Sequence, residues 1–322
     1  MKRTLIGLLS AMLPVTGMAV GISDTISPQP AELMPLASHS VLLDVTDTGK
    51  RLVAVGERGH VVVSLDGETW IQAPTPVRAY LTAVDFADEM NGMAVGHDST
   101  ILRTRDGGRS WVLQNFEPVE VPDMDSDEPF LDVLMLNSRD AFAVGAYSKF
   151  YRTRNGGETW EDFDTPIRED GWHFNSIIRL NNGDLFITGE QGTLAVSTDQ
   201  GETWEALDSP YSSTMFGAAP VGTEGVLICG LRGNVFYSPS PASGEWTQLD
   251  TGLRDSLISA EQLPNGEVVM VGINGVVMLT EGGLQRVRQL DNPEGITLAG
   301  VQPVKSAVVV VGNAGTQLLA NP

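Results

Sequence analysis

The residues able to carry acid–base chemistry are few and lie far apart in the chain. Asp44 and Asp132 occupy matching positions in two internal repeats, and two carboxylates facing one channel could act as a general acid and a general base. No histidine or arginine is in register with them, so a solvated channel lining is the favoured interpretation. The four histidines show no metal-ligand spacing. We therefore predict no catalytic residue, no bound metal and no cofactor.

Two further features have a chemical interpretation and a simpler alternative. Glu117–Glu128 holds six carboxylates in twelve residues, with an alternation like that of a calcium loop. It lacks the glycine with which such a loop turns, so a solvated loop is favoured and cation binding stays an open question. Cys229, the single cysteine, ends an apolar run, which is typical of a small core residue rather than a catalytic thiol.

Composition excludes one class of partner. The chain of 322 residues has 41 Asp and Glu against 20 Lys and Arg, a formal net charge of −21. The phosphates of a nucleic acid would be repelled by this charge, so we predict no nucleic-acid partner. A soluble acidic surface is the favoured explanation of the charge, ahead of a basic partner.

The N-terminus resembles an export signal. Lys2 and Arg3 precede an apolar stretch, Leu5–Val15, that is short for a membrane-spanning helix, and small residues allow cleavage after Ala19. We predict a signal peptide at residues 1–19 and a periplasmic or otherwise exported protein. The alternative is an uncleaved anchor, which also places the folded part outside the cytoplasm.

The chain that positions these residues is built from repeats. A glycine that follows an apolar pair recurs at intervals of 40 to 49 residues. No segment shows a helical period, and a repeat of this length with four short apolar runs is typical of a β-propeller blade. We predict an all-β, seven-bladed β-propeller with four antiparallel strands per blade. The seven glycines are Gly56, Gly96, Gly145, Gly189, Gly230, Gly272 and Gly312.

Counting back from each glycine aligns the innermost strands. One position is small or short in every blade, as crowding around a central axis requires, and the position two residues earlier is large and apolar. The small residues are Asp44, Ala83, Asp132, Ser176, Ala218, Ala260 and Gly300. The large residues are Leu42, Leu81, Phe130, Phe174, Phe216, Ile258 and Leu298.

Ring closure is predicted from the two ends of the chain. Blade seven ends soon after its third strand, Thr316–Leu319, and has no fourth strand of its own. Ala31–Val45 has the length and layout of Trp70–Val84, so Ala31–Met34 is predicted to be the missing outer strand, which would remove an open edge. The predicted organisation is a closing segment at residues 20–39 and the propeller at residues 40–322.

The turns that end in tryptophan resemble a known repeat. Thr104–Trp111 and Ser197–Trp204 match the Asp-box, or BNR, pattern in full, Thr153–Trp160 carries Asn155 in place of Asp, and Ser64–Trp70 is one residue short. The aspartate of such a turn accepts N–H bonds from its own turn, so we predict a structural role. The predicted structural residues are Asp66, Trp70, Asp106, Trp111, Asn155, Trp160, Asp199 and Trp204.

These boxes, together with the glycine after the second strand, resemble the photosystem II stability and assembly factor family over Ser40–Pro322. That resemblance implies an exported, non-catalytic, protein-binding scaffold, and a monomer, that assists assembly or stability of a membrane-protein complex. The complex would be photosystem II if the source is phototrophic, and otherwise another membrane assembly such as an envelope exporter.

An enzyme is the alternative, because Asp boxes also occur in sialidases, which are carbohydrate-active. A sialidase needs three arginines converging on a substrate carboxylate, and its Arg-Ile-Pro motif is absent here. The candidate arginines lie on the third strand or beside the box, away from the axis. They are Arg103, Arg105, Arg152 and Arg154.

The remaining function is binding, and one face is the candidate surface. The turns between strands two and three share a face with the links between blades, where basic and aromatic side chains gather. The alternative is a set of ordinary exposed turns. The predicted partner-binding residues are Arg58, His97, Tyr147, Lys149, Trp172 and Arg232.

Overall fold

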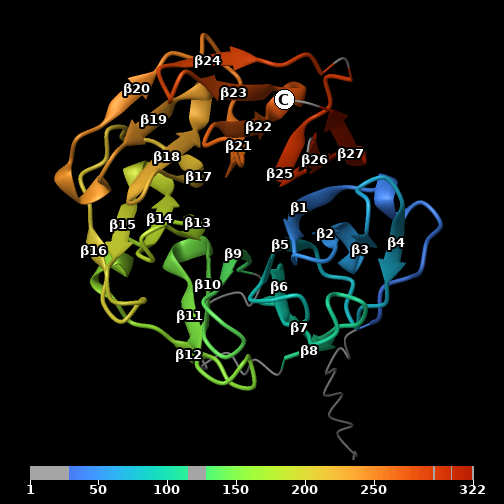
Figure 1. The fold of residues 1–322 in the computed structure, drawn as a ribbon. Coiled ribbons are helices and arrows are strands. Elements are labelled where there is room, and N and C mark those ends of the chain that lie inside the picture. The colour runs from blue at the N-terminus through green and yellow to red at the C-terminus, as the bar shows by residue number, and fades with distance from the viewer. Residues whose placement is uncertain (1–28, 115–127, 293, 306, 321–322) are drawn as a thin grey trace, which may run out of the picture.

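The computed structural model describes residues 29–114, 128–292, 294–305 and 307–320, and it is a ring of seven sheets around a central axis (Figure 1). The predicted signal peptide and nearly all of the acidic run Glu117–Glu128 lie outside these ranges. Within them, no helix has the length and apolar character needed to cross a membrane. The prediction of an all-β seven-bladed propeller is confirmed.

Each blade is an antiparallel sheet whose strands follow chain order from the axis outward. Blades one to three comprise β1 (Leu42–Asp47), β2 (Leu52–Gly56), β3 (Val61–Ser64), β4 (Trp70–Ala73); β5 (Leu81–Phe86), β6 (Gly92–Gly96), β7 (Ile101–Thr104), β8 (Val112–Leu113); and β9 (Phe130–Met135), β10 (Ala141–Gly145), β11 (Phe150–Thr153), β12 (Glu161–Asp162). Blades four and five comprise β13 (Phe174–Arg179), β14 (Leu185–Gly189), β15 (Leu194–Ser197), β16 (Glu205–Ala206); and β17 (Met215–Val221), β18 (Gly225–Gly230), β19 (Val235–Ser238), β20 (Thr247–Leu249). Blades six and seven comprise β21 (Leu257–Gln262), β22 (Val268–Gly272), β23 (Val277–Glu281), β24 (Arg286–Gln289); and β25 (Leu298–Val304), β26 (Ala307–Gly312), β27 (Gly315–Ala320).

The repeating glycines are required by a close approach of two backbones. A Cβ built on Gly96 would lie 1.9 Å from the carbonyl oxygen of Tyr80, and on Gly145 it would lie 2.3 Å from that of Pro129. Each of these oxygens belongs to the link that enters the innermost strand of the same blade. Glycine is the residue without a Cβ, so it alone fits this contact.

The register of the innermost strands corrects the sequence alignment in two blades. A bulge follows the residue opposite the repeating glycine, and the next paired residue is Gly217 in blade five and Ser259 in blade six. The predicted residues Ala218 and Ala260 are therefore one position too late. The same shift makes Met215 and Leu257, both fully buried, the large residues in place of Phe216 and Ile258. The turn between the first two strands differs in length among blades, and a count from the glycine cannot detect this.

The core lies between neighbouring blades, as the large residues of the innermost strands indicate. Phe130, Phe174 and Leu298 pack into separate clusters with the middle strands of an adjacent blade. Complete burial of such a side chain contributes about 1.5–3 kcal/mol to the stability of the fold. The ring is thus held by a repeated contact, and each blade depends on its two neighbours.

Ring closure differs from the prediction. The sheet of blade seven has three strands, and residues 29–34 form no strand. This segment lies along blade one instead, where Ala31 N–H donates to Thr75 O at 3.0 Å and Met34 N–H donates to Gln72 Oε1 at 2.7 Å. The Gln72 side chain also donates to Glu32 O. The side-chain amide of Gln72, rather than backbone hydrogen bonds between two strands, therefore holds this segment on blade one.

The seam between the first and last blades is instead sealed by a short 3-10 turn, η1 (Ala37–His39). Ala37 is buried in a cluster with Leu42 of blade one and Val309 and Val311 of blade seven. A Cβ on Gly315 would lie 1.9 Å from Ser38 O, so the turn also contacts the start of β27 directly. The closing segment therefore joins the two blades by packing rather than by strand pairing.

Candidate functional site

One face of the ring is formed by a turn that is repeated in six blades, and we call it the turn face. It carries the 3-10 turns η2 (Glu57–Gly59), η3 (Ala146–Ser148), η5 (Glu190–Gly192), η6 (Leu231–Gly233) and η8 (Ile273–Gly275), with residues 97–99 in the second blade. The residue after the repeating glycine donates its N–H to the link that enters the innermost strand, for example His97 to Tyr80 O at 2.9 Å and Leu231 to Thr214 O at 3.1 Å. These bonds confirm that the turns and the links share a face.

The turn face places one side chain per turn on a strained backbone position. The second residue after the glycine has a φ between 52° and 58° in these six blades, in the left-handed region. Asn and Asp tolerate this region, whereas a larger side chain is costly there. The residues are Arg58, Asp98, Tyr147, Gln191, Arg232 and Asn274. The arginines, tyrosine and glutamine are therefore held at the tips of turns where asparagine would be less strained.

Most of the predicted partner-binding residues lie exposed on this face. Arg58, His97 and Arg232 are exposed, and Tyr147 and Trp172 have exposed fractions of 59% and 41%. The Tyr147 and His173 rings meet edge to face at 4.8 Å, and Tyr147 N–H lies 3.2 Å from His173 Nδ1. The Tyr147 and His173 side chains thus form one contact between blade three and the link into blade four.

Lys149 does not belong to this exposed surface, which corrects its predicted role. Its side chain is only 8% exposed, and Nζ donates to Ser99 Oγ at 2.6 Å and to Glu128 O at 2.8 Å. Nζ also lies 4.5 Å from the centroid of the Phe130 ring. Burial lowers the pKa of Lys149 to about 8. Its amine joins blades two and three and is not available to a partner.

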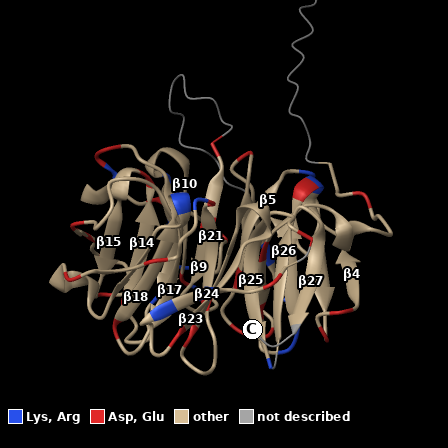
Figure 2. Ribbon diagram, turned by 90° about the horizontal axis from the view of Figure 1, so that it is seen from above, with Lys and Arg blue, Asp and Glu red and all other residues tan. Residues whose placement is uncertain are grey.

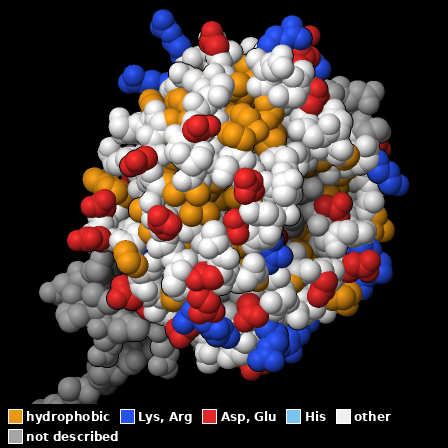
Figure 3. Space-filling view, turned by 60° about the vertical axis from the view of Figure 1, so that its left-hand side comes forward, with side chains coloured by type: hydrophobic (Ala, Val, Ile, Leu, Met, Phe, Trp, Pro, Cys, Tyr) orange, Lys and Arg blue, Asp and Glu red, His pale blue; other side chains and the backbone are white. Residues whose placement is uncertain are grey.

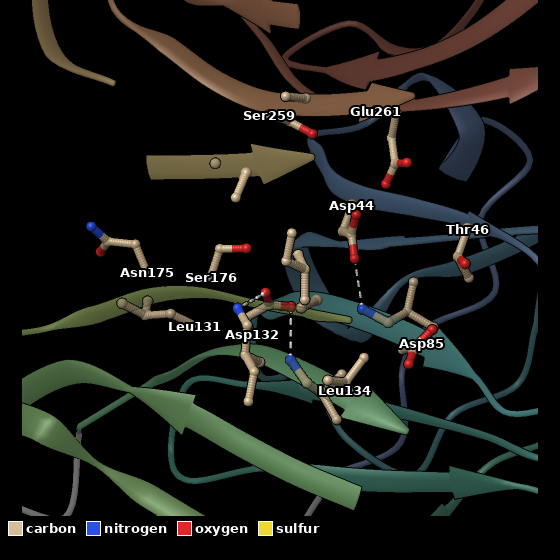
Figure 4. Close-up of a pocket in the computed structure, with 18 of the residues that line it drawn as sticks. Asp44, Thr46, Asp85, Leu131, Asp132, Leu134, Asn175, Ser176, Ser259 and Glu261 are labelled. Atoms are coloured by element: carbon tan, nitrogen blue, oxygen red, sulfur yellow. Dashed lines mark hydrogen bonds between the residues drawn. The ribbon is translucent and has the colours of Figure 1, made fainter. Parts of the chain in front are cut away.

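The central channel holds a second group of polar residues. A cavity of about 620 Å³ runs between the innermost strands, and Asp44, Asp85, Asp132 and Glu261 line it (Figure 4). Val84 N–H donates to Asp44 Oδ2 and Ile177 N–H donates to Asp132 Oδ2, each at 2.8 Å, and Met135 N–H donates to Asp85 Oδ2 at 2.7 Å. Each of the three aspartates therefore joins its own blade to the next one in the ring.

The environment of these carboxylates favours their protonated forms. Burial raises the pKa of Asp44 and Asp85 to about 6 and that of Asp132 to about 7, although backbone N–H groups act in the opposite direction. Burial and the charges of the three aspartates raise the pKa of Glu261 to about 8. Perturbed carboxylates in a cavity are typical of active sites, but structural groups show the same shifts.

Asp85 and Glu261 were missed by the sequence analysis. The register pairs Asp85 with Met93 and Glu261 with Val269, so both follow the aligned small residue by two positions. Side chains of a strand alternate between its two faces, so that spacing places them on the channel side. The alternation of side chains along a strand, with its period of two residues, was the sequence signal that could have identified both residues. The one-residue misalignment of blade six concealed Glu261.

The opposite face carries the turns that end in tryptophan, and we call it the box face. In blade four, Thr203 donates to Asp199 both from N–H, at 2.9 Å, and from its hydroxyl, at 2.6 Å. These hydrogen bonds lower the pKa of the Asp199 carboxyl group, and the bond from the Thr203 side chain has the largest effect. Asp66 accepts from Glu68 and Thr69 N–H in the same way, and Asn155 from Thr159 N–H. The polar groups of these turns are largely used within the turns.

Several arginines near the box face bond to groups of the protein itself. Arg154 donates to both carboxylate oxygens of Glu202, at 2.8 Å each, and Arg103 donates to Gly156 O at 2.6 Å. Arg152 pairs with Glu161 and Glu202. Arg152 and Arg154 line one cavity of about 220 Å³, and no third arginine lines it. The described ranges hold no group of His, Cys, Asp or Glu suited to a metal ion.

Acidic side chains occur on several sides of the ring. Seen from the side, most Asp and Glu positions lie in the loops of the two faces rather than within strands (Figure 2). The outer wall facing the viewer in Figure 3 has scattered acidic side chains with small apolar patches between them, and Lys and Arg gather at its margins. The acidic net charge is thus spread widely over the surface.

The seven sheets and the repeated turns define the class of the protein, a seven-bladed β-propeller. The family model described as photosynthesis system II assembly factor YCF48 matches residues 113–280. This region is more than half of the 322 residues, and the chain belongs to that family.

Individual relatives agree with this assignment. The chain is 34% identical over 90 residues to photosystem II stability/assembly factor HCF136, chloroplastic, of Cyanidioschyzon merolae, a match that covers 26% of this chain and 21% of that protein. The solved structure "YCF48 bound to D1 peptide" superposes with a TM-score of 0.71 at 18% identity, over 93% of this chain and 96% of that one. Streptogramin B lyase superposes with a TM-score of 0.69 at 13% identity, over 90% and 96%. At such identities these structures show the fold alone, which also occurs in an enzyme.

Proposed function

We propose that this protein is an exported, non-catalytic scaffold that binds a membrane-protein subunit and assists assembly or stability of its complex. Membership of the photosystem II assembly factor family is the observation that carries this proposal. The complex is photosystem II if the source is phototrophic, and another membrane assembly, such as an envelope exporter, otherwise. The similar YCF48 was solved with a bound D1 peptide, which supports a segment of a membrane protein as partner.

The turn face is the proposed binding surface. Arg58, Tyr147 and Arg232 stand at the strained tips of three turns, and strain of this kind is concentrated at functional sites. Trp172, in a link between blades, and His97, in a turn, add aromatic area to this face. Arg, Tyr and Trp are the residues that most often dominate binding energy at protein interfaces.

Affinity capture tests the proposed function. The tagged protein, expressed in its source and captured from solubilised membranes, should retain one membrane-protein complex or its assembly intermediate, identified by mass spectrometry. Loss of the gene should lower the amount of that same complex. Capture of soluble proteins only, with normal levels of every membrane complex in the deletion strain, would contradict the proposal.

Export has its own test. The charged start and the small residues before Val20 predict that the protein in the envelope fraction begins near Val20. N-terminal sequencing of that fraction measures the cleavage site. Cytosolic protein with an intact N-terminus would show that the export part of the proposal is wrong.

A carbohydrate-active enzyme is the rival function, supported by the carboxylates that line the channel. Replacing Asp132 with Asn removes the carboxylate with the highest pKa among the three aspartates. An enzyme that uses this channel would lose glycosidase turnover in the variant. A scaffold should show no glycosidase turnover in wild type or variant, and should keep its client.

A further inference from the structure

An open groove lies on the outer side of blade one, apart from the channel and from the turn face. It measures about 530 Å³, within the range of roughly 300–1,000 Å³ for ligand pockets. Its walls include Val63 and Ala73, together with Leu65 and Ile71, whose exposed fractions are 79% and 67%. Exposed aliphatic side chains of this size beside one groove are a feature of binding surfaces.

One end of the groove contains a buried arginine. Arg51 lines the groove and is only 8% exposed. In the part of the chain that the structure describes, its Nε is buried without a hydrogen-bond partner and no carboxylate forms an ion pair with it. A buried N–H group without a partner is costly, and this one belongs to a cation in a protein with a net charge of −21. An anion in the groove would be attracted to the charge of this guanidinium group.

A second cation stands at the same groove. Arg109, from the box turn of blade two, is exposed and lines it together with Arg51. The two arginines belong to neighbouring blades, because Arg51 follows the turn between β1 and β2, and Arg109 precedes β8. An anionic group in the groove is therefore attracted by two cations, against the repulsion of one carboxylate, Asp66, that also lines it.

The other polar groups of the groove are already used by the protein. Ser64 donates to Asp66, and Asp66 accepts from two N–H groups of its own turn. Gln72 is bonded to Met34 and Glu32 through its side-chain amide, and Pro74 has no N–H. An alkyl chain needs no hydrogen-bond partner along these walls. The apolar lining with two arginines therefore suits an amphiphile with an anionic head.

We propose that this groove binds a medium-chain fatty acid, with its carboxylate at Arg51 and Arg109 and its alkyl chain along Leu65, Ile71 and Ala73. The site lies on the box-face side of blade one, away from the turn face, so it is independent of the proposed partner surface. Free fatty acid is the source that fits an open groove of this volume.

Decanoate, below its micellar concentration, is the probe, and isothermal titration calorimetry with the purified full chain is the measurement. Wild type should bind it, and Arg51→Met, which keeps the apolar stem and removes the charge, should bind about tenfold more weakly or worse. Ile71→Ser, at an exposed position that the fold does not require, should weaken binding by shortening the apolar wall. Arg232→Met on the turn face is the matched control and should bind as wild type does.

Two ligand comparisons decide the chemistry. Decanol has the chain without the anionic head and acetate has the head without the chain, and both should bind far more weakly than decanoate. A rise in melting temperature with decanoate, seen in wild type and absent in Arg51→Met, should accompany the calorimetric result.

Three results would overturn the proposal. In the first, Arg51→Met binds decanoate as tightly as wild type does. In the second, wild type binds decyltrimethylammonium as tightly as decanoate, and in the third it does not bind decanoate. If a short peptide with an apolar C-terminal residue binds at Arg51 and decanoate does not, the groove is a peptide site and the fatty-acid assignment is wrong.

Discussion

The two faces of the ring are built from equally regular turns, but they use their polar groups differently. On the box face, Asp66 and Asp199 accept several hydrogen bonds from their own turns. On the turn face, the backbone is tied by the repeating glycine and the link, while Arg58 and Arg232 point outward from left-handed positions. The box face therefore serves mainly the fold, and the turn face keeps side chains that the fold does not require.

The largest expected effect on stability comes from a substitution at a repeating glycine of the turn face. Gly96→Ala places a Cβ 1.9 Å from Tyr80 O, so the link must move and the free energy of unfolding should fall by about 3 kcal/mol or more. Gly171→Ala is the control, because a Cβ there meets nothing within 4 Å, and its φ of 71° alone should cost about 1 kcal/mol. Denaturant titration measures both. Equal losses would mean that close approach is not the reason for the glycine.

The second effect concerns the box face. Asp199→Ala removes the acceptor of the Thr203 N–H, the Thr203 hydroxyl and the Ser197 hydroxyl. The free energy of unfolding should fall by about 1–2 kcal/mol, with client capture unchanged at a temperature where the variant is folded. A variant as stable as wild type but unable to capture its client would show that the box turn is a binding element.

The channel predicts an unusual pH dependence of stability. The folded-state pKa values of Asp44, Asp85, Asp132 and Glu261, from about 6 to about 8, lie above the ordinary values of 3.8 and 4.5. The folded state therefore binds more protons than the unfolded state between about pH 4 and pH 8, so stability should rise as the pH falls through this window and then level off. Because the four side chains are only partly buried and interact, the total gain should be about 1–3 kcal/mol.

Glu261→Gln isolates one of these groups. The substitution removes the charge that the three aspartates oppose, so it should stabilise the protein at pH 8 by about 1 kcal/mol and make the pH profile less steep. Asp250→Asn, at an exposed position, is the control and should leave the profile as it is. Melting temperatures between pH 5 and pH 8.5 measure the effect. A wild-type protein that becomes steadily less stable from pH 8 to pH 5 would contradict this account of the channel.

The smallest expected change in stability comes from a substitution at the tip of a turn on the turn face, and it tests whether that side chain serves the fold. Arg232→Asn puts a residue that tolerates a positive φ at a turn tip whose φ is 58°. The free energy of unfolding should rise by about 0.5 kcal/mol because the strain is relieved, and client binding should weaken because the proposed function assigns this arginine to the binding surface. Thermal melting and capture are measured on the same preparation. A destabilised variant would show that the arginine side chain supports the fold.

The sequence predicts the ring because its period is long and is repeated seven times. Seven glycines at regular intervals require seven equivalent places in space, and the structure shows why each is a glycine, as at Gly96 against Tyr80. Ring closure at Ala31–Met34 could not be obtained from the same pattern. The similar length of this segment and an outer strand does not decide whether it packs on blade one or on blade seven. The side chain of Gln72 holds it on blade one.

The candidate sites are less predictable because they depend on side-chain direction. Lys149 has the sequence position of a turn-face residue, but its flexible stem folds back to Ser99 and Glu128 and is buried. Asp85 and Glu261 follow from strand alternation once the register is known, and a one-residue error in blade six is enough to conceal the second. The buried Arg51 has no sequence signal at all, because its burial depends on the neighbouring blade.

The central claim is that the turn face, rather than the box face, binds the client. Arg58, Tyr147 and Arg232 are replaced together with alanine in one variant, and Arg105 and Arg154 in a control of the box face. Both variants should melt close to wild type, since all five residues lie at the surface. Quantitative capture of the client from solubilised membranes should fall about tenfold or more for the turn-face variant and stay near wild type for the control. Capture that survives the turn-face substitutions and is lost with Arg105 and Arg154 would place the binding surface on the opposite face and contradict the account.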